Sequence, residues 1–173
     1  MCVEVDLPPI MDRSAIASRI PHQGRMCLLD AVLRYDDADI ACTTRSHLLA
    51  DNPLRHNGVL GAAVGVEYAA QAMALHCALL AGDAPRARSG YLTSVRALEL
   101  HAHTLDETSQ PLLIAASRLA LNDNTAMYQF SIHAGERLLV KGRLSAVIDA
   151  ADTVSAANAT EDLAAASGSA GLG

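Results

Sequence analysis

The stretch VGVEYAAQAMALHCALLAG, residues 64–82, decides how this chain folds. Its apolar residues surround the whole circumference of a helix, so the helix must be buried on most sides. Gly82, the last residue of the stretch, and Pro85 beyond it end the helix. A carboxylate, Glu67, lies near its start, and an amide, Gln71, follows four residues later on the same helix face.

Composition and charge limit what the protein can be. Its 173 residues suffice for one domain with a sizeable core, and 51% of them are hydrophobic. The formal net charge of −6 argues against non-specific binding to nucleic acid or to acidic membranes. A membrane-spanning role for residues 59–81 is disfavoured because Glu67, Gln71 and His76 lie inside that segment.

The cysteines and the N-terminus indicate a reduced compartment. No two cysteines form a CxxC pair, and each lies in apolar sequence, where a free thiol behaves as a small hydrophobic group. The first twenty residues contain no apolar run of signal-peptide length. We therefore expect a cytoplasmic protein with free thiols at Cys2, Cys27, Cys42 and Cys77.

Strand-like segments flank the helix on both sides. Before it, residues 26–35 and 38–47 predict a hairpin that turns at Asp36 and Asp37. After it, four more strands are predicted, within residues 88–100, 111–121, 126–133 and 137–149.

This order predicts an α+β hot-dog fold, in which an antiparallel sheet wraps around one long buried central helix. We assign the hot-dog domain to residues 20–149, preceded by an N-terminal arm, residues 1–19. Residues 150–173 form a tail rich in Ala, Ser and Gly that we predict to be disordered. An exposed sheet edge predicts a dimer in which two sheets pair edge to edge.

Glu67 has two interpretations. It could lie at a domain or dimer boundary and bond to backbone amides, or it could act as a general acid or base in an apolar tunnel, where desolvation raises its pKa. His56, just before the helix, and His22, before the first strand, are candidate catalytic partners. His76 is interpreted as a core or tunnel-wall residue. No histidine or cysteine cluster has metal-ligand spacing, so no metal site is predicted.

Four segments together carry a family resemblance: IPHQGRMCLLDAV (20–32), DNPLRHNGVLGAAVGVEYAAQAMALH (51–76), GYLTSVR (90–96) and VKGRLSAVI (140–148). They resemble the beta-hydroxyacyl-[acyl carrier protein] dehydratases of the hot-dog superfamily, in the branch found in aryl-polyene biosynthesis clusters. The resemblance covers most of the predicted domain.

The resemblance implies a lyase that removes water from a beta-hydroxyacyl thioester in fatty-acid or aryl-polyene type biosynthesis. The substrate is carried on the phosphopantetheine of an acyl carrier protein, and no cofactor is bound. A catalytic histidine of one subunit faces the helix acid of the other, in a homodimer or in a heterodimer with a second hot-dog dehydratase. The acid corresponds to Glu67, and the glutamine of the same motif corresponds to Gln71.

The resemblance also implies a substrate-binding surface. In these enzymes backbone amides near the start of the helix hold the thioester oxygen, and Gly58 and Gly61 are the close-approach positions here. Tyr68 is a candidate tunnel-lining residue, although on an apolar helix it could equally belong to the core. The acidic carrier requires a basic landing patch, for which the candidates are Arg13, Arg19, Arg25, Arg86, Arg88 and Arg96.

One departure from the family leaves the catalytic base open. The family histidine lies fourteen residues before the acid, and that position here is Pro53. A shortened loop could present His56 instead, His22 could substitute, or the chain could be a non-catalytic partner subunit of a heterodimeric dehydratase. A hot-dog acyl thioesterase is a further alternative, because such enzymes also place an acid on this helix.

Overall fold

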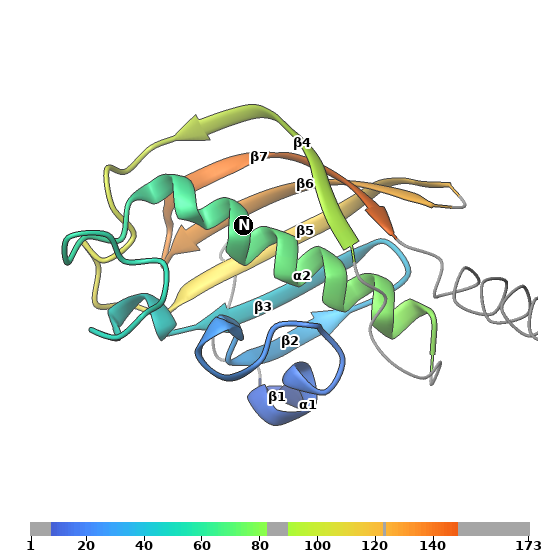
Figure 1. Cartoon of the computed structure of the whole chain (residues 1–173), viewed down its shortest axis with the longest axis horizontal. Helices are drawn as coiled ribbons and strands as arrows, with labels where there is room; N and C mark the ends of the chain where they lie inside the picture. Colours follow the sequence, from blue (N-terminus) through green and yellow to red (C-terminus); the bar gives the residue numbers. More distant parts are fainter. Residues whose placement is uncertain (1–7, 83–89, 123, 149–173) are drawn as a thin grey trace, which may run out of the picture.

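The computed structural model describes residues 8–82, 90–122 and 124–148. Its strands form a single antiparallel sheet of order β1-β2-β3-β5-β6-β7-β4 (Figure 1). They are β1 (Met11–Asp12), β2 (Ala31–Tyr35), β3 (Asp39–Thr44), β4 (Gly90–Leu100), β5 (Leu112–Asn122), β6 (Thr125–Ala134) and β7 (Arg137–Ile148). The helices are α1 (Arg13–Ala17) and α2 (Gly65–Leu80), with 3-10 turns η1 (Gly24–Met26), η2 (Ser46–Leu48) and η3 (Ala62–Val64).

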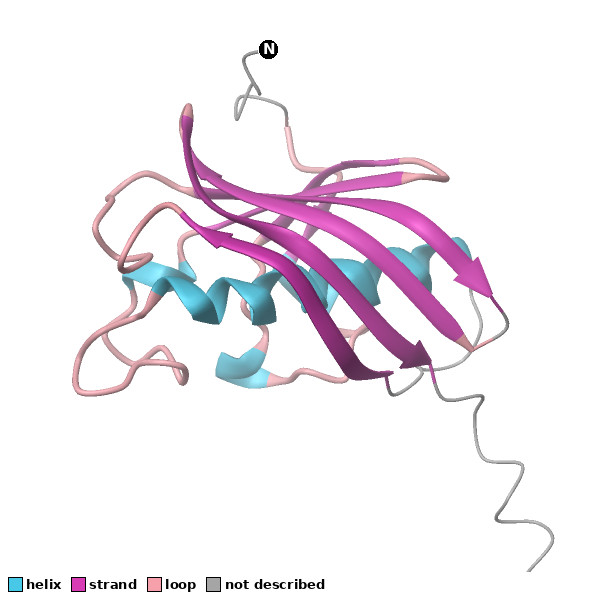
Figure 2. Ribbon diagram, turned by 90° about the horizontal axis from the view of Figure 1, so that it is seen from above, coloured by secondary structure: helices cyan, strands magenta, loops and turns pink. Residues whose placement is uncertain are grey.

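The sheet curves around α2, which lies along its inner face (Figures 1 and 2). The predicted span of this helix is confirmed to within two residues at each end, and Gly82 adopts the left-handed conformation that typically ends a helix. In β6 the predicted alternation also holds, with Ala126, Tyr128, Phe130 and Ile132 all buried against the helix side.

The helix qualifies by length and composition as a membrane span, since residues Ala62–Leu80 are apolar enough to cross a bilayer. In the fold it is instead a core helix. Tyr68, Ala69, Ala72 and Leu75 are completely buried and belong to the main hydrophobic cluster together with residues of the sheet. A core helix explains the apolar sequence without a membrane.

The folded domain includes part of the segment assigned to the N-terminal arm. Met11 pairs with Val32, which adds β1 to the sheet, and Ile16 of α1 is fully buried in the core. Asp12 caps α1 by accepting a hydrogen bond from the Ala15 backbone N–H at 2.9 Å. The assigned tail, residues 150–173, lies outside the described residues.

Gly65 sets the distance between α2 and the sheet. A Cβ atom added there would lie 2.9 Å from Cδ1 of the fully buried Ile132 and 3.3 Å from Cγ2 of Val140. We expect Gly65→Ala to lower the free energy of unfolding by about 1–3 kcal/mol, because overpacking forces buried neighbours to shift. Urea denaturation checks this value. Gly61→Ala is the matched control, since no heavy atom lies within 4 Å of its added Cβ.

Candidate active site

A carboxylate and an imidazole meet at the start of α2. Glu67 lies in the first turn of the helix, and His22 lies in the segment between α1 and η1. Their nearest atoms, His22 Nε2 and Glu67 Oε1, are 3.2 Å apart, and the two side chains are 29% and 33% exposed. The pair is therefore half-buried but open to a reactant.

Gln71, one helical turn after Glu67, holds the carboxylate of this pair in place. Its side chain is completely buried, and its Nε2 donates to Glu67 Oε1 at 3.0 Å and to the Met26 carbonyl at 2.8 Å. Its Oε1 accepts from the Leu28 backbone N–H at 2.9 Å. Both amide hydrogens are thus used within the protein. Gln71, which the family resemblance places among the candidate substrate-binding residues, orients Glu67 and ties the helix to the chain that follows His22.

Local sequence holds His22 in place. Ile20 is buried in the core, and Gln23 Nε2 donates to the carbonyls of Ala17 and Ile20 at 2.7 and 3.2 Å. Gly24 has a φ of 58°, which glycine adopts without a steric penalty and which starts the η1 turn. The IPHQG segment is therefore anchored on both sides of the imidazole.

The electrostatic environment of Glu67 differs from the sequence-based expectation. Burial raises the pKa of Glu67, but hydrogen bonds from His22 and Gln71, with the imidazole charge, lower it by more in total. The net pKa lies below the usual 4.5, so Glu67 is a carboxylate at neutral pH. The predicted rise in the pKa of Glu67 was wrong, because that prediction took account of burial but not of the hydrogen bonds from His22 and Gln71.

The hydrogen-bond pattern also shows which ring nitrogen of His22 carries the hydrogen that points to Glu67. An ionised carboxylate can only accept, so Nε2 must carry the hydrogen that points to Oε1. The other ring nitrogen, Nδ1, is buried and has no hydrogen-bond partner among the described residues. Nε2 and the Glu67 oxygens are therefore the groups available to a substrate.

His56 lies apart from this pair. Within the described chain the polar partners of Glu67 are His22 and Gln71, and the His56 side chain is exposed in a tight turn. The backbones of His56 and Val59 exchange two hydrogen bonds of 3.0 Å, with positive φ at Asn57 and Gly58 between them. This protomer therefore brings His22, and not His56, to its own Glu67.

The two candidate glycines occupy different places. Gly58 lies in the exposed turn, where its carbonyl accepts from Arg55 Nη1 at 2.8 Å. Gly61 precedes η3 directly and forms an isolated bridge with Thr104, next to the start of α2. Open space surrounds the Cβ position of both. Of the two, Gly61 is the one that adjoins the helix start.

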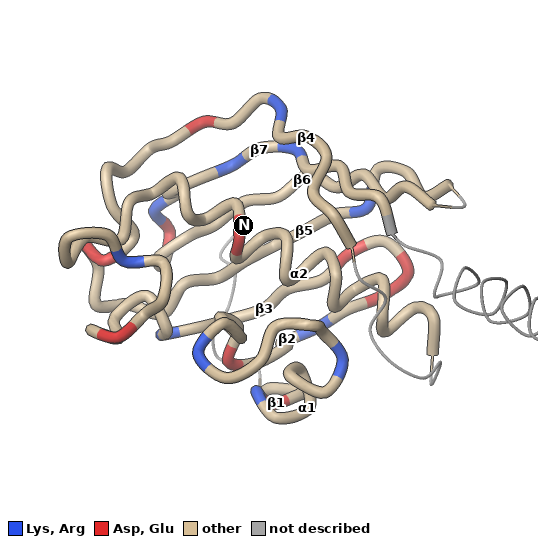
Figure 3. The backbone as a smooth tube through the Cα atoms, in the orientation of Figure 1, with Lys and Arg blue, Asp and Glu red and all other residues tan. Residues whose placement is uncertain are grey.

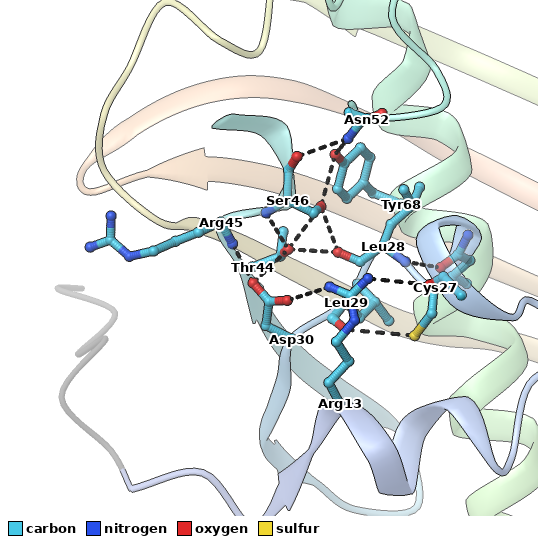
Figure 4. Close-up of polar contacts among 12 residues, drawn as sticks. Arg13, Cys27, Leu28, Leu29, Asp30, Thr44, Arg45, Ser46, Asn52 and Tyr68 are labelled. Carbon is cyan, nitrogen blue, oxygen red and sulfur yellow. Dashed lines mark hydrogen bonds and ion pairs between the residues drawn. The ribbon is translucent and has the colours of Figure 1, made fainter. Parts of the chain in front are cut away.

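Tyr68 belongs to a buried polar network on the other side of the helix start (Figure 4). Its side chain is 0% exposed, and its hydroxyl accepts from Asn52 Nδ2 at 3.0 Å and from Ser46 Oγ at 3.1 Å. Ser46 and Thr44 in turn contact the Leu28 carbonyl at 2.7 and 2.6 Å. The core alternative for Tyr68 therefore fits the structure, and its network holds the loop before α2.

One flank of α2 is only partly covered. Val66, Ala70, Ala74 and Cys77 follow one another at helical spacing on the same flank as Glu67, and all are only partly buried. On the neighbouring edge strand β4, Leu92, Val95 and Leu100 are 43, 37 and 49% exposed. Their cross-strand partners in β7 are buried, so these three side chains lie on the core side of the sheet. An apolar surface next to Glu67 is thus partly exposed in the described chain.

A family model for ApeP dehydratase, described as ApeP-like, matches residues 14–157. The chain belongs to the ApeP-like dehydratase family. This match confirms the resemblance to hot-dog dehydratases that the IPH and VEYAAQAMA segments carry. A search of curated proteins gave no match to this ApeP-like chain.

Solved structures similar to the ApeP-like chain share its fold. The dehydratase heterocomplex ApeI:P from Xenorhabdus doucetiae is 20% identical with a TM-score of 0.69, covering 84% of this chain and 96% of that one. Zebrafish thioesterase superfamily member 2 is 13% identical with a TM-score of 0.55, covering 79% and 93%. Thioesterase HI1161 from Haemophilus influenzae is 16% identical with a TM-score of 0.51, covering 72% and 81%. These similarities confirm the hot-dog fold.

The remaining histidine named from sequence lies in the core of the ApeP-like chain. His76 is fully buried, with Nε2 2.7 Å from the Asp36 carbonyl and Nδ1 2.8 Å from the Tyr128 hydroxyl. A carbonyl only accepts, so Nε2 carries the hydrogen and, in neutral His76, Tyr128 donates to Nδ1. Both ring nitrogens are satisfied, which makes His76 a core residue. Among the described residues, no group of three or more potential metal ligands is present.

Sequence reasoning did not find the polar network around Tyr68. Ser46 and Asn52 are ordinary turn residues by sequence, and nothing in their spacing links them to a tyrosine on the helix. The only available signal was a tyrosine inside an otherwise apolar helix, because a buried phenol usually needs a hydrogen-bond partner.

Proposed function

We propose that this ApeP-like chain eliminates water from a beta-hydroxyacyl thioester carried on the phosphopantetheine of an acyl carrier protein. The observation that carries the proposal is the direct contact between His22 Nε2 and Glu67 Oε1 beside an apolar surface. Elimination requires one group that accepts a proton and one that donates it, both within reach of the same substrate. Family membership as a dehydratase supports this reaction class.

We assign the proton transfers from the state of the pair. The Glu67 carboxylate accepts the proton from the carbon alpha to the thioester, and that C–H electron pair forms the new double bond. The bond between the beta carbon and its hydroxyl oxygen breaks, and His22 donates its Nε2 hydrogen so that water leaves. The proton then passes from Glu67 to His22 through their contact, which restores the starting state.

These roles reverse the ones that the family resemblance implies, in which the histidine is the base. The lowered pKa of Glu67 keeps this group ionised at neutral pH, so its carboxylate is available as the proton acceptor. The buried position of His22 Nδ1 leaves Nε2, a donor toward Glu67, as the reactive atom of the ring. The Ala62 and Val64 amides already donate to the carbonyls of His103 and Gly61, so in this proposal the remaining backbone amides near Gly61, at the positive end of the α2 dipole, hold the thioester oxygen.

A second hot-dog chain completes the tunnel in this proposal. The partly exposed flank of α2 and the exposed inner side chains of β4 provide an apolar surface for it, and the edge of β4, the last strand of the sheet among the described residues, provides backbone groups. The partner is a second copy of this chain or a second hot-dog dehydratase. The acyl carrier protein docks near Arg25, which lies three residues after His22 and is 72% exposed. Arg86 and Arg88 lie outside the described residues.

We propose a cytoplasmic location for this chain. Among the described residues Cys27, Cys42 and Cys77 are free cysteines, and free thiols persist in a reducing compartment. Cys2 lies outside the described residues.

The experiment is a dehydration assay on a 3-hydroxyacyl carrier protein, followed by intact mass. We expect the carrier-bound substrate to lose the mass of one water when the chain is supplied alone or with a hot-dog partner chain. Water loss only in the presence of a partner that is inactive alone supports a heterodimeric enzyme. Release of the free acid would contradict elimination and indicate a thioesterase. No turnover in either arm would contradict the proposed elimination.

A further inference from the structure

The outer face of the sheet, on the side opposite α2, carries an ordered row of polar side chains. Cross-strand register aligns one outward residue from each of five neighbouring strands. In sheet order these residues, which we call the polar row, are Asp39, Ser117, Gln129, Arg143 and Arg96. They point outward because the residues that alternate with them in β3, β5, β6 and β7 are buried against the helix.

The basic end of the polar row is electrostatically unsatisfied. Arg96 and Arg143 are direct cross-strand partners and both are exposed. Like charges in this arrangement destabilise a sheet. Within the described residues neither guanidinium has an acidic partner, since the nearby Glu99 is engaged by Lys141 at 3.1 Å and by His101 at 3.4 Å. An anion placed over the two arginines would remove this repulsion.

The acidic end is unsatisfied too. Asp39 begins β3, next to the exposed β2–β3 turn that also carries Asp36 and Asp37 (Figure 3). The backbone N–H of Asp39 is bonded, but its carboxylate has no partner in the part of the chain that the structure describes. The polar row therefore runs from an unpaired acid to two unpaired bases over four strand spacings, about 19 Å.

A groove lies at the centre of the polar row. This groove lines the same face between β5 and β4, with small side chains at Ala97, Ala115, Ser117 and Ser131 and a volume of about 370 Å³. Gln129, on the middle strand of the five, projects beside it and its amide has no partner among the described residues. This centre can receive side chains from another surface without a clash.

A row with opposite charges at its ends is complementary to itself. A two-fold axis parallel to the strands and passing at Gln129 reverses the row, so that Asp39 of one copy faces Arg96 of the other, with Arg143 one strand away. Two sheets related this way keep their strands roughly aligned, as in common face-to-face packing. The two Gln129 amides then face each other at the axis.

We propose that this outer face binds a second copy of the chain through the antiparallel pairing of two polar rows. Charge complementarity supports a second copy because the same surface supplies both the missing anion and the missing cations. This interface is separate from the β4 edge and leaves the surface around Glu67 free. It does not depend on the proposed dehydration.

Sedimentation equilibrium of the full-length chain tests the proposal. We expect the average particle mass to double with rising concentration at about 0.05 M salt, and much less at about 0.5 M salt, where surface charges are screened. Arg96→Asp and Asp39→Arg should each weaken this doubling by about tenfold or more in dissociation constant. The chain with both substitutions should regain it, because the swapped charges again face their opposites.

Two exposed variants with the same charge changes are the controls. Arg137→Asp in the β6–β7 hairpin and Asp37→Arg in the β2–β3 turn lie outside the polar row and should leave the association unchanged. Circular dichroism shows that each variant is folded. A single particle mass independent of salt and of these charges would overturn the proposal. So would a double variant that fails to regain association, which would indicate a free anion as the ligand of Arg96 and Arg143.

Discussion

Replacing His22 with alanine should lower the turnover number for dehydration by about 10² to 10⁴-fold, the usual contribution of one positioned proton-transfer group. His22 Nε2 is the group that contacts Glu67 Oε1, and removing it leaves no proton donor for the departing hydroxyl in the described site. Glu67→Gln should be equally damaging, because an amide keeps the shape but cannot accept the proton. The measurement is single-turnover water loss from the carrier-bound substrate.

His56→Ala is the matched control for this prediction. The His56 side chain is exposed in the turn before η3 and contacts neither member of the pair in this chain. Turnover should therefore remain near that of the wild type. If instead His56→Ala abolishes turnover and His22→Ala does not, the shortened-loop hypothesis is correct and the His22–Glu67 contact is structural.

Mixing the two inactive variants decides whether the pair acts within one chain. In the structure both residues come from the same protomer, whereas the family resemblance implies a histidine and an acid from different subunits. If the pair acts within one chain, a mixture of His22→Ala and Glu67→Gln chains contains no intact site and stays inactive. Recovery of part of the activity on mixing would show that the functional site is assembled across the interface.

The fold was predictable because its determinants are local and repetitive. A long apolar helix with Gly82 after it and the strict alternation in β6 are periodic signals that tertiary contacts rarely override. The role of residues 11–17 was not predictable in this way. β1 has only two residues and α1 only five, so neither is long enough to show a periodic pattern of apolar residues. The position of β1 in the sheet depends on the pairing of Met11 with Val32.

The site was predictable in its members but not in its contacts. Glu67, Gln71 and His22 were all named, because polar groups in apolar sequence are conspicuous. Which histidine meets Glu67 depends on the path of the loops, and the tight turn at Asn57 and Gly58 leaves His56 exposed in this chain. The direction of the Glu67 pKa shift likewise depends on two donors whose positions only the folded chain defines.

Gln71 should be as important for stability as for the chemistry. Gln71→Leu removes the acceptor of the Leu28 N–H and the donor to the Met26 carbonyl, and both partners face the buried amide. An unsatisfied buried polar group costs about 1–3 kcal/mol, so we expect the free energy of unfolding to fall by about 2–4 kcal/mol. Urea denaturation measures this loss. Gln110→Leu, at an exposed position, should change it by less than about 0.5 kcal/mol.

The pH dependence separates the two roles of Gln71. In the folded chain the pKa of Glu67 is depressed, so this group stabilises the fold above its unfolded pKa, near 4.5, and the contribution is lost as the pH falls through the folded value. Gln71→Leu removes one of the donors that lower this pKa and leaves the burial that raises it. The difference in free energy of unfolding between variant and wild type should therefore be largest at neutral pH. It should become smaller as the pH falls below about 4.5.

The same change should appear in catalysis. A higher pKa of Glu67 moves the acidic limb of the rate profile toward neutral pH, because the proposed proton acceptor is the ionised carboxylate. A loosened carboxylate should also lower the turnover number by about 10 to 10²-fold, with a smaller effect on the Michaelis constant. If Gln71→Leu lowers stability but leaves the acidic limb where it was, Gln71 only supports the fold. If both move together, the amide that holds Glu67 in place also sets its protonation state.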